Sequence, residues 1–331
     1  MTRRAALAGL LAAPGLAPGR GLTQGAGAGA GPGAEWPNRP IRLVIPYPPG
    51  GPTDLLGRVA AQRLTAALPF PVVAENRAGA GGAIGAEQVA RAAPDGHTLL
   101  ANASAHVILP HMLRLPFDAV ADFAPITCIA AVPLVLVVTP NLPVRSVAEL
   151  VALAKAKPGQ LAYASSSNGG APHLAGEMFK LLAGVDLAHV PYRGSGQALP
   201  DLVAGNVQVM FDSLASSAAL VREGRLKALA VTTEQRIAGF PELPTVAEAG
   251  VPGYAITTWY GMWAPARTPA SILARVQQAV AAGVRQPEAA ERLASMGAEP
   301  VAQPPEGFAA FATAEYERYG KLVREANIRA D

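Results

Sequence analysis

The sequence predicts an α/β protein of two lobes, each a mostly parallel sheet flanked by helices. Short apolar runs ended by turn residues alternate with segments whose apolar residues recur at helical spacing, and this alternation is typical of parallel sheets covered by helices. The alternation occurs in two units of similar size. Two long apolar segments, 126–139 and 257–264, lie between or after these units, and we interpret them as crossover strands that form a hinge.

The first unit begins with the apolar run IRLVIPY at 41–47, which predicts a buried strand that ends at the turn residues following it. Thr53 or Asp54 is expected to cap the next helix, which extends to about Leu68, because both residue types accept hydrogen bonds from free helix amides. The unit continues with an expected strand at 71–74, helix at 83–92 and strand at 97–101.

The second unit repeats the pattern. Ser146 is expected to cap a helix that ends near Ala156. The following elements are strands expected at 161–164, 187–190, 207–211 and 228–232, and helices expected at 173–183 and 197–204. Three helices, expected at 271–284, 287–295 and 305–326, close the chain.

The two expected crossover strands, 126–139 and 257–264, predict where the chain divides into its two lobes. If the first crossing leaves one lobe and the second returns to it, lobe one comprises 36–137 plus 258–331, and lobe two comprises 138–257. Two lobes joined in this way would enclose a cleft between them.

The net positive charge of the chain comes from its first 34 residues. Of 331 residues, 27 are basic and 24 acidic, and residues 1–34 contain Arg3, Arg4 and Arg20 but no acid. The remainder is therefore neutral overall, which excludes a general electrostatic footprint for nucleic acid. Half of all residues are apolar, which excludes a disordered chain.

Residues 1–34 predict an export signal and a low-complexity linker. Arg3-Arg4 is followed by an apolar stretch, 5–17, which is too short to span a bilayer and is typical of signal peptides. Small residues with Ala-x-Ala options follow at 25–33. The arginine pair permits the twin-arginine route as well as the general one, so the route and the cleavage site stay open. We expect a soluble mature protein outside the cytoplasm.

Four glycine-rich loops each follow an expected strand and precede an expected helix: 48–54, 79–82, 165–170 and 192–196. In open α/β sheets ligands bind at this edge. Free amides at helix N-termini favour anions there, and glycine lets the backbone approach a ligand closely. Arg193, the cation inside one of these loops, is a candidate partner for a carboxylate.

Catalytic and metal motifs are weak, so we expect no catalytic residue, no metal and no cofactor. The single cysteine, Cys128, excludes an internal disulfide or a cysteine zinc cage. No HExxH, GxSxG or P-loop motif occurs. The alternative is a secreted enzyme that uses the same cleft, either an oxidoreductase with a nucleotide cofactor at Gly79–Gly85 or a serine hydrolase that pairs Ser165–Ser167 with His173.

The loops and their flanks resemble the substrate-binding receptors of tripartite tricarboxylate transporters, the Bug family. The matching stretches run in family order along nearly the whole mature chain: IPYPPGGPTD (45–54), ENRAGAGGAIGAEQVARAAPDGHTLL (75–100), YASSSNGGAPHLAGEMF (163–179), VPYRGSGQALPDLVAGNVQVMFD (190–212), GRLKALAVTTEQR (224–236) and ELPTVAEAGVPGY (242–254).

This resemblance implies a monomeric receptor with the type II-like periplasmic-binding-protein fold, which closes on a small carboxylate and hands it to inner-membrane permease subunits. By position, the implied ligand-binding residues are Tyr47, Gly50, Gly51, Thr53, Asp54, Gly81, Gly82, Ala83, Ser166, Asn168, Gly169, His173, Tyr192, Arg193, Gly194, Ser195 and Asp212. A di- or tricarboxylate, an amino acid and an aromatic acid all remain open as ligands, and the permease is not identified.

Overall fold

The computed structural model describes residues 36–295 and 297–329, and the strands it describes join in one mixed sheet. The order is β2-β1-β3-β9-β4-β7-β5-β6, with β10 and β8 also paired to β4. The strands are β1 (Ile41–Ile45), β2 (Val72–Asn76), β3 (Thr98–Ala103), β4 (Phe123–Val138), β5 (Ala162–Ser165), β6 (Ala188–Pro191), β7 (Val209–Ser213), β8 (Lys227–Val231), β9 (Thr257–Pro265) and β10 (Glu299–Pro300). The expected export segment lies outside the described residues.

Helices separate most of these strands along the chain. The helices are α1 (Pro52–Ala67), α2 (Ala83–Ala90), α3 (Ala105–Ile108), α4 (Val147–Ala156), α5 (Ala171–Ala183), α6 (Ser195–Ala204), α7 (Leu214–Arg222), α8 (Ala270–Val284), α9 (Pro287–Ser295) and α10 (Pro305–Glu325), with 3₁₀ turns η1 (Ala80–Gly82) and η2 (Leu109–His111).

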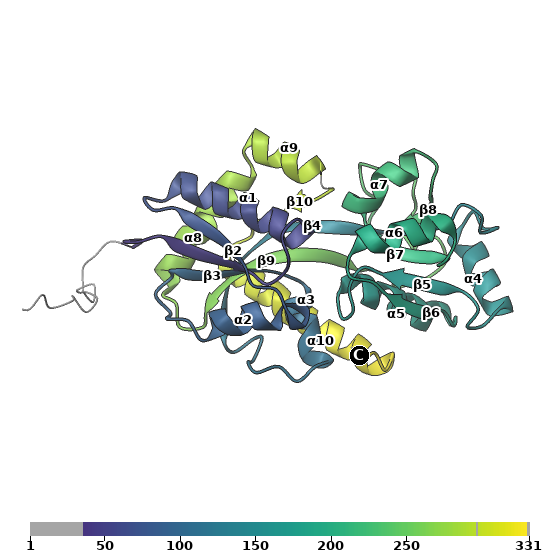
Figure 1. Cartoon of the computed structure of the whole chain (residues 1–331), viewed down its shortest axis with the longest axis horizontal. Helices are drawn as coiled ribbons and strands as arrows, with labels where there is room; N and C mark the ends of the chain where they lie inside the picture. The colour runs from purple at the N-terminus through teal and green to yellow at the C-terminus, as the bar shows by residue number, and fades with distance from the viewer. Residues whose placement is uncertain (1–35, 296, 330–331) are drawn as a thin grey trace, which may run out of the picture. The chain divides into compact units, whose positions relative to one another are not determined.

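The sheet has two regions of parallel pairing joined by antiparallel strands, which confirms the predicted two-lobe α/β fold. β1 pairs in parallel with β2 and β3, and β5 pairs in parallel with β6 and β7. The two crossing strands, β4 and β9, pair antiparallel with each other from Phe123↔Pro265 to Pro133↔Thr257. Both extend from one lobe toward the other in Figure 1. The predicted lobe boundaries at 137/138 and 257/258 stay a prediction.

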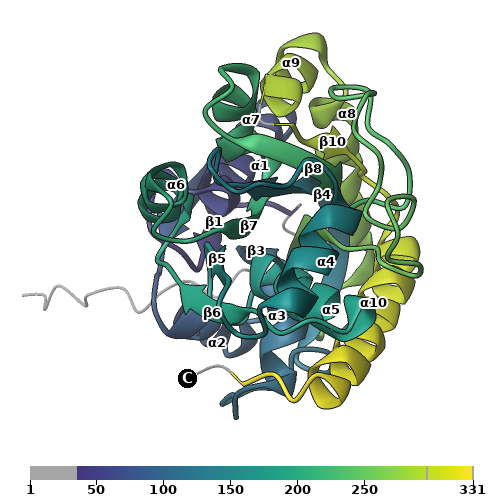
Figure 2. The ribbon, with the colours of Figure 1, turned by 90° about the vertical axis from the view of Figure 1, so that its right-hand side faces the viewer.

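Helices cover both faces of the first lobe's sheet. Side chains of α1 and α8, including Leu64 and Val280, form one core with β1. Helices α2 and α10 pack on the opposite face, and Figure 2 shows the two groups on opposite sides of the strands. This second core continues into the other lobe, where it includes Tyr163 and Phe211. The lobes therefore share apolar packing as well as strands.

Two helix starts test the capping predictions. Ser146 does cap α4, because its Oγ accepts a hydrogen bond from the Glu149 amide at 3.1 Å. The prediction for α1 was wrong: its N-cap is Gly51, without a side-chain cap bond, and Thr53 and Asp54 lie within the first turn. Pro52 explains the earlier start, because its restricted φ suits the first helical position.

Two short helices were not expected. Helix α7 begins directly after β7 and has the sequence LASSAALVR, in which serine and alanine interrupt the apolar spacing. Helix α3 is only one turn long. Helix α3 contributes Ala105 to the lining of the cavity described below, and α7 begins directly after Ser213, another lining residue.

Gly261 provides a test of the packing between β9 and α10. A Cβ built at this position would lie 2.3 Å from Cζ of Phe308, a fully buried ring. We expect Gly261→Ala to lower the unfolding free energy by about 1–3 kcal/mol, the usual cost of overfilling a packed core. Urea denaturation measures this loss. Gly239→Ala is the matched control, since open space surrounds that position, and an equal effect of both substitutions would contradict the proposed packing.

Candidate functional site

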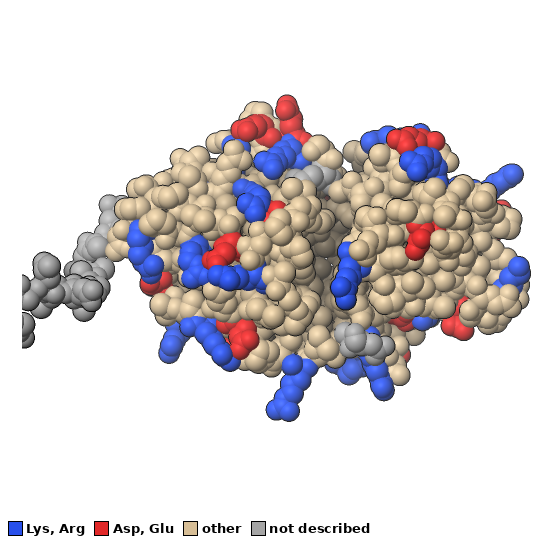
Figure 3. Space-filling view, in the orientation of Figure 1, with Lys and Arg blue, Asp and Glu red and all other residues tan. Residues whose placement is uncertain are grey.

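A cavity of about 390 Å³ lies between the two lobes. Loops from both lobes line it, and the crossing strands β4 and β9 contribute Leu134, Thr258 and Tyr260 to its lining. Figure 3 shows the surface hollowed between the two halves of the described body. The cavity therefore occupies the position predicted from the two crossings.

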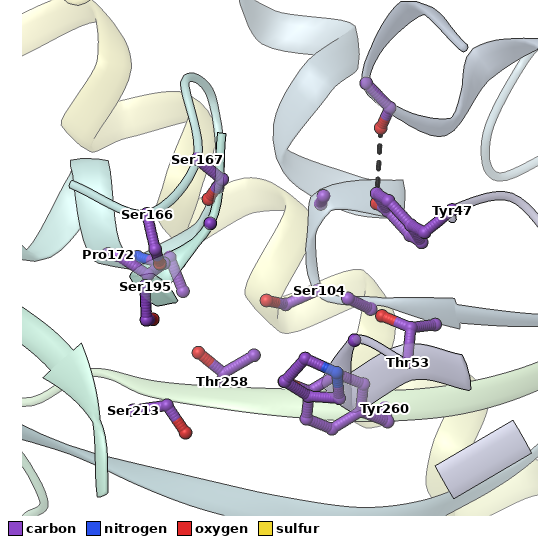
Figure 4. A pocket seen from close by; sticks show the side chains of 18 of the residues that line it. Tyr47, Thr53, Ser104, Ser166, Ser167, Pro172, Ser195, Ser213, Thr258 and Tyr260 are labelled. Carbon is purple, nitrogen blue, oxygen red and sulfur yellow. Dashed lines mark hydrogen bonds between the residues drawn. The ribbon is translucent and has the colours of Figure 1, made fainter. Parts of the chain in front are cut away.

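The structure brings all four glycine-rich loops to this cavity. Nine of the sequence-predicted residues line it: Tyr47, Gly51, Thr53, Gly81, Ser166, Asn168, Arg193, Gly194 and Ser195. In Figure 4, Tyr47 and Thr53 lie on one side, whereas Ser166 and Ser195 face them from the other. The loops meet because each follows the carboxyl end of a strand in the continuous sheet.

Eight predicted residues lie outside the cavity lining: Gly50, Asp54, Gly82, Ala83, Gly169, His173, Tyr192 and Asp212. Most of them adjoin a lining residue in the chain. Hydrogen bonds and backbone conformations of several of them shape the loops that form the cavity wall.

Asp54 holds the first loop in place. Its buried carboxylate accepts hydrogen bonds from the Gly50 amide (2.9 Å), Arg58 Nε (2.9 Å) and Asn76 Nδ2 (2.8 Å). Asn76 also donates to the Tyr47 carbonyl at 3.0 Å. Burial alone would raise the pKa of Asp54, but the hydrogen bonds from Arg58, Gly50 and Asn76 outweigh it and lower the pKa. Asp54 is thus an ionised support behind the loop.

Tyr47 connects the first loop to the second. Its hydroxyl donates to the Gly81 carbonyl at 3.2 Å, the bond drawn in Figure 4. Gly82 has a φ of +105°, and a Cβ there would lie 3.1 Å from the Tyr47 hydroxyl oxygen. Glycine is needed both for this backbone conformation and for the close approach. Burial raises the pKa of Tyr47 further above its ordinary value, so the phenol stays a neutral donor.

His173 shapes the third loop from behind. Its Nδ1 accepts a hydrogen bond from the Gly169 amide at 3.2 Å, and its ring stacks on His189 with centroids 4.0 Å apart. Burial, with a smaller effect of Lys180, lowers the pKa of His173 to about 4. The imidazole is therefore neutral and able to accept this bond. Gly169 itself has a φ of +73°.

The hydrogen bond predicted for a serine hydrolase is not formed among the described residues. Ser165 Oγ lies 2.7 Å from Nε2 of His189, not from His173. Ser165 is fully buried and is not among the described lining residues, so this serine–histidine pair does not face the cavity.

Asp212 supports the fourth loop from below. Ser195 Oγ and Ser216 Oγ donate to its two carboxylate oxygens at 2.5 and 2.6 Å. Asp212 is fully buried, and burial raises its pKa despite the serine hydrogen bonds that lower it. The Gly194 amide donates to the Ser166 carbonyl at 2.9 Å and joins this loop to the third.

Arg193 lines the cavity, whereas its neighbour Tyr192 does not. The Tyr192 hydroxyl donates to Asp201 at 2.7 Å, which anchors the loop to α6. Arg193 is exposed and lines the cavity. Within 36–295 and 297–329 it is the one charged side chain of the lining, so any charge-assisted contact from a lining side chain comes from this residue.

Several lining residues were not predicted from the sequence. They include Ser104, Ser213, Thr258 and Tyr260. Ser104 and Ser213 come at the carboxyl ends of β3 and β7, so the strand-end rule that identified the glycine loops could have found them. Thr258 and Tyr260 lie within β9, and only the pairing of the strands brings them to the cavity.

Two features are absent from the part of the chain that the structure describes. No helix there is long and apolar enough to cross a bilayer. No group of three or more His, Cys, Asp or Glu side chains there is placed to hold a metal ion.

The chain is similar to known receptors. Residues 56–328 match the family model described as tripartite tricarboxylate transporter family receptor. A solved R. palustris structure with adipate is 37% identical, with a TM-score of 0.81 over 89% of this chain and 99% of that one. The periplasmic binding protein BugD is 33% identical (TM-score 0.78; 89% and 99% covered). MatC of Rhodopseudomonas palustris with bound malate is 31% identical (TM-score 0.76; 87% and 100% covered).

The Asp54 hydrogen bonds predict a pH-dependent stability. Because the pKa of Asp54 is lowered on folding, its contribution is complete above the unfolded value of about 4 and disappears as the pH falls through the folded value. We expect Asp54→Asn to reduce the unfolding free energy by about 1–3 kcal/mol at pH 7 and by progressively less toward pH 3.

Urea denaturation across this pH range measures the difference between the variant and the parent protein. Asp186→Asn serves as the control, because Asp186 is exposed and its side chain makes no hydrogen bond to the described residues. If Asp54→Asn lowered the unfolding free energy by the same amount at every pH, the charge of the carboxylate would not be what holds the loop.

Proposed function

The chain belongs to the tripartite tricarboxylate transporter receptor family, and we propose that it captures a small carboxylate in the cavity between its lobes and delivers it to inner-membrane permease subunits. It is accordingly a periplasmic solute-binding receptor, in a family of receptors rather than of enzymes. The observation that carries the proposal is the convergence of four glycine-rich loops, from both lobes, on one cavity that has Arg193 in its wall.

The proposed carboxylate contacts are the loop amides and hydroxyls, together with Arg193. One helix N-terminus contributes about 0.3–1 kcal/mol toward an anion, whereas micromolar affinity requires about −8 kcal/mol. A single loop is therefore insufficient. Helices α1, α2, α5 and α6 all begin next to loops that line the cavity, so several termini and a guanidinium can act on one ligand.

The proposed site residues divide into two groups. The nine predicted residues that line the cavity would touch the ligand. The eight behind them would position those nine, chiefly through Asp54, His173 and Asp212. A ligand that contacts both lobes would favour a closed arrangement over an open one, because only the closed form makes both sets of contacts. We propose that the receptor works as a monomer.

Carboxylate binding predicts a thermal shift. The related structures hold adipate and malate, so these two acids belong in a panel with citrate, glutamate and benzoate, and with NAD as the control. A carboxylate at 100 times its Kd should add about 2.7 kcal/mol to the unfolding free energy. A shift with NAD alone would instead favour the nucleotide-dependent enzyme.

Arg193→Gln should weaken the binding of that carboxylate roughly 10- to 100-fold, which corresponds to the loss of a charged hydrogen bond. Arg114→Gln is the matched control, since Arg114 is also exposed and does not line the cavity. Titration calorimetry of both variants measures the change. Equal affinities would remove Arg193 from the site.

Export predicts a processed N-terminus. We expect Edman or mass-spectrometric sequencing of protein from the periplasm to begin within or shortly after 25–34, because the small residues there suit signal cleavage. Replacing Arg3 and Arg4 by lysine should stop export only if the twin-arginine route is used. Periplasmic protein that retains Met1 would contradict cleavage.

A further inference from the structure

Three hydroxyl-bearing residues form the floor of the cavity. Ser213 pairs with Leu134 on one side of β4, and Thr258 of β9 pairs with Val132 on the other. Directly paired residues, and residues two apart on a strand, face the same side of a sheet. Ser213, Leu134 and Thr258 therefore share one face, and Ser104 follows the end of β3 beside them. In Figure 4 the hydroxyls of Ser104 and Thr258 point into the space between the loops.

Two of these hydroxyls are buried and have no hydrogen-bond partner among the described residues. They belong to Ser104 and Ser213, residues that are 1% and 8% exposed. Buried polar groups are normally hydrogen-bonded, and both of these serines line the cavity, so a molecule bound there can supply the missing partner. Both serines occupy N-cap positions, where serine usually bonds to its own helix, yet neither does so.

The floor offers no charged side chain, and its positive charge is limited to the partial charge of the α3 and α7 N-termini at Ser104 and Ser213. Arg193, the charged side chain of the described lining, is exposed, whereas Ser104 and Ser213 are buried. Asp212, next to Ser213, is fully buried and hydrogen-bonded to Ser195. A carboxylate placed on this floor would lose its hydration and lie close to a buried acid, and two helix N-termini, each contributing about 0.3–1 kcal/mol, would replace a full counter-ion only in part. A neutral oxygen group carries none of these costs and would satisfy both hydroxyls.

The walls between the loops and the floor are largely hydrocarbon. Leu109, Leu134, Pro172, Ala103 and Tyr260 all line the cavity. Such walls favour an apolar body between the polar groups at the two ends of a ligand.

We propose that the ligand is a monocarboxylate whose apolar body ends in an uncharged hydroxyl or carbonyl group. The loops and Arg193 would take the carboxylate, and Ser104 and Ser213, assisted by Thr258, would take the neutral group. This inference rests on the proposed function and narrows it, because it separates this receptor from those that hold the dicarboxylates adipate and malate.

Two matched sets of acids test the proposal by titration calorimetry on refolded mature protein. One set is hexanoate, 6-hydroxyhexanoate and adipate, and the other is benzoate, 4-hydroxybenzoate and terephthalate. Within each set the body is constant and the far end is a hydrogen, a hydroxyl or a carboxylate. In at least one set we expect the hydroxy acid to bind about tenfold more tightly than either companion, as one added hydrogen-bonded group allows.

Substitutions at the floor serines show whether their hydroxyls cause the tighter binding of the hydroxy acid. Ser104→Ala and Ser213→Ala should reduce the advantage of the hydroxy acid over the unsubstituted acid from about tenfold to less than twofold. Neither substitution removes a hydrogen bond within the described protein, so both variants should fold. Ser217→Ala is the control, because Ser217 is equally buried but already donates to the Ser213 carbonyl, and it does not line the cavity.

The inference would be overturned if the dicarboxylates bound more tightly than the hydroxy acids, or if both floor variants still bound the hydroxy acid about tenfold more tightly than the unsubstituted acid. Either result would still support a receptor for carboxylates. Binding of none of the six acids would overturn the inference together with the proposed function.

Discussion

The pairing of β4 with β9 is the interaction on which the rest of the structure depends. Both strands extend through the centre of the sheet, and β4 also pairs with β7, β8 and β10. The parallel strands of each lobe attach to this antiparallel pair. As a result, loops that lie more than 100 residues apart in the sequence, such as those at Tyr47 and Ser166, reach a single cavity. The same two strands also supply part of the cavity floor.

Buried polar side chains give the loops their shape. Asp54, His173 and Asp212 are each at most 3% exposed, and each is hydrogen-bonded to a loop that lines the cavity. A flexible glycine loop would lose conformational entropy when it binds a ligand. Side chains that already fix the loop reduce that loss, so in the proposed receptor the residues behind the cavity would raise affinity without touching the ligand.

The polar groups that line the cavity differ in exposure. Arg193 is exposed, whereas Ser104 and Ser213 are buried, and the proposed ligand would place its carboxylate at the first and a neutral oxygen at the others. Charge is expensive to bury without a counter-ion, and hydroxyl groups are less so. On the proposed placement, the loops would recognise the carboxylate and the floor would discriminate among ligands by their far end.

The sequence by itself determined the fold class, most elements and the four loops. Those features depend on local patterns: apolar spacing, glycine after a strand and serine before a helix such as α4. Only the tertiary structure decided which loop residues line the cavity and which support them, since Asp54 and Thr53 are neighbours in sequence but only Thr53 reaches the lining. It also decided that Ser104, Ser213 and Thr258 share a floor, because strand register, a long-range property, brings them together.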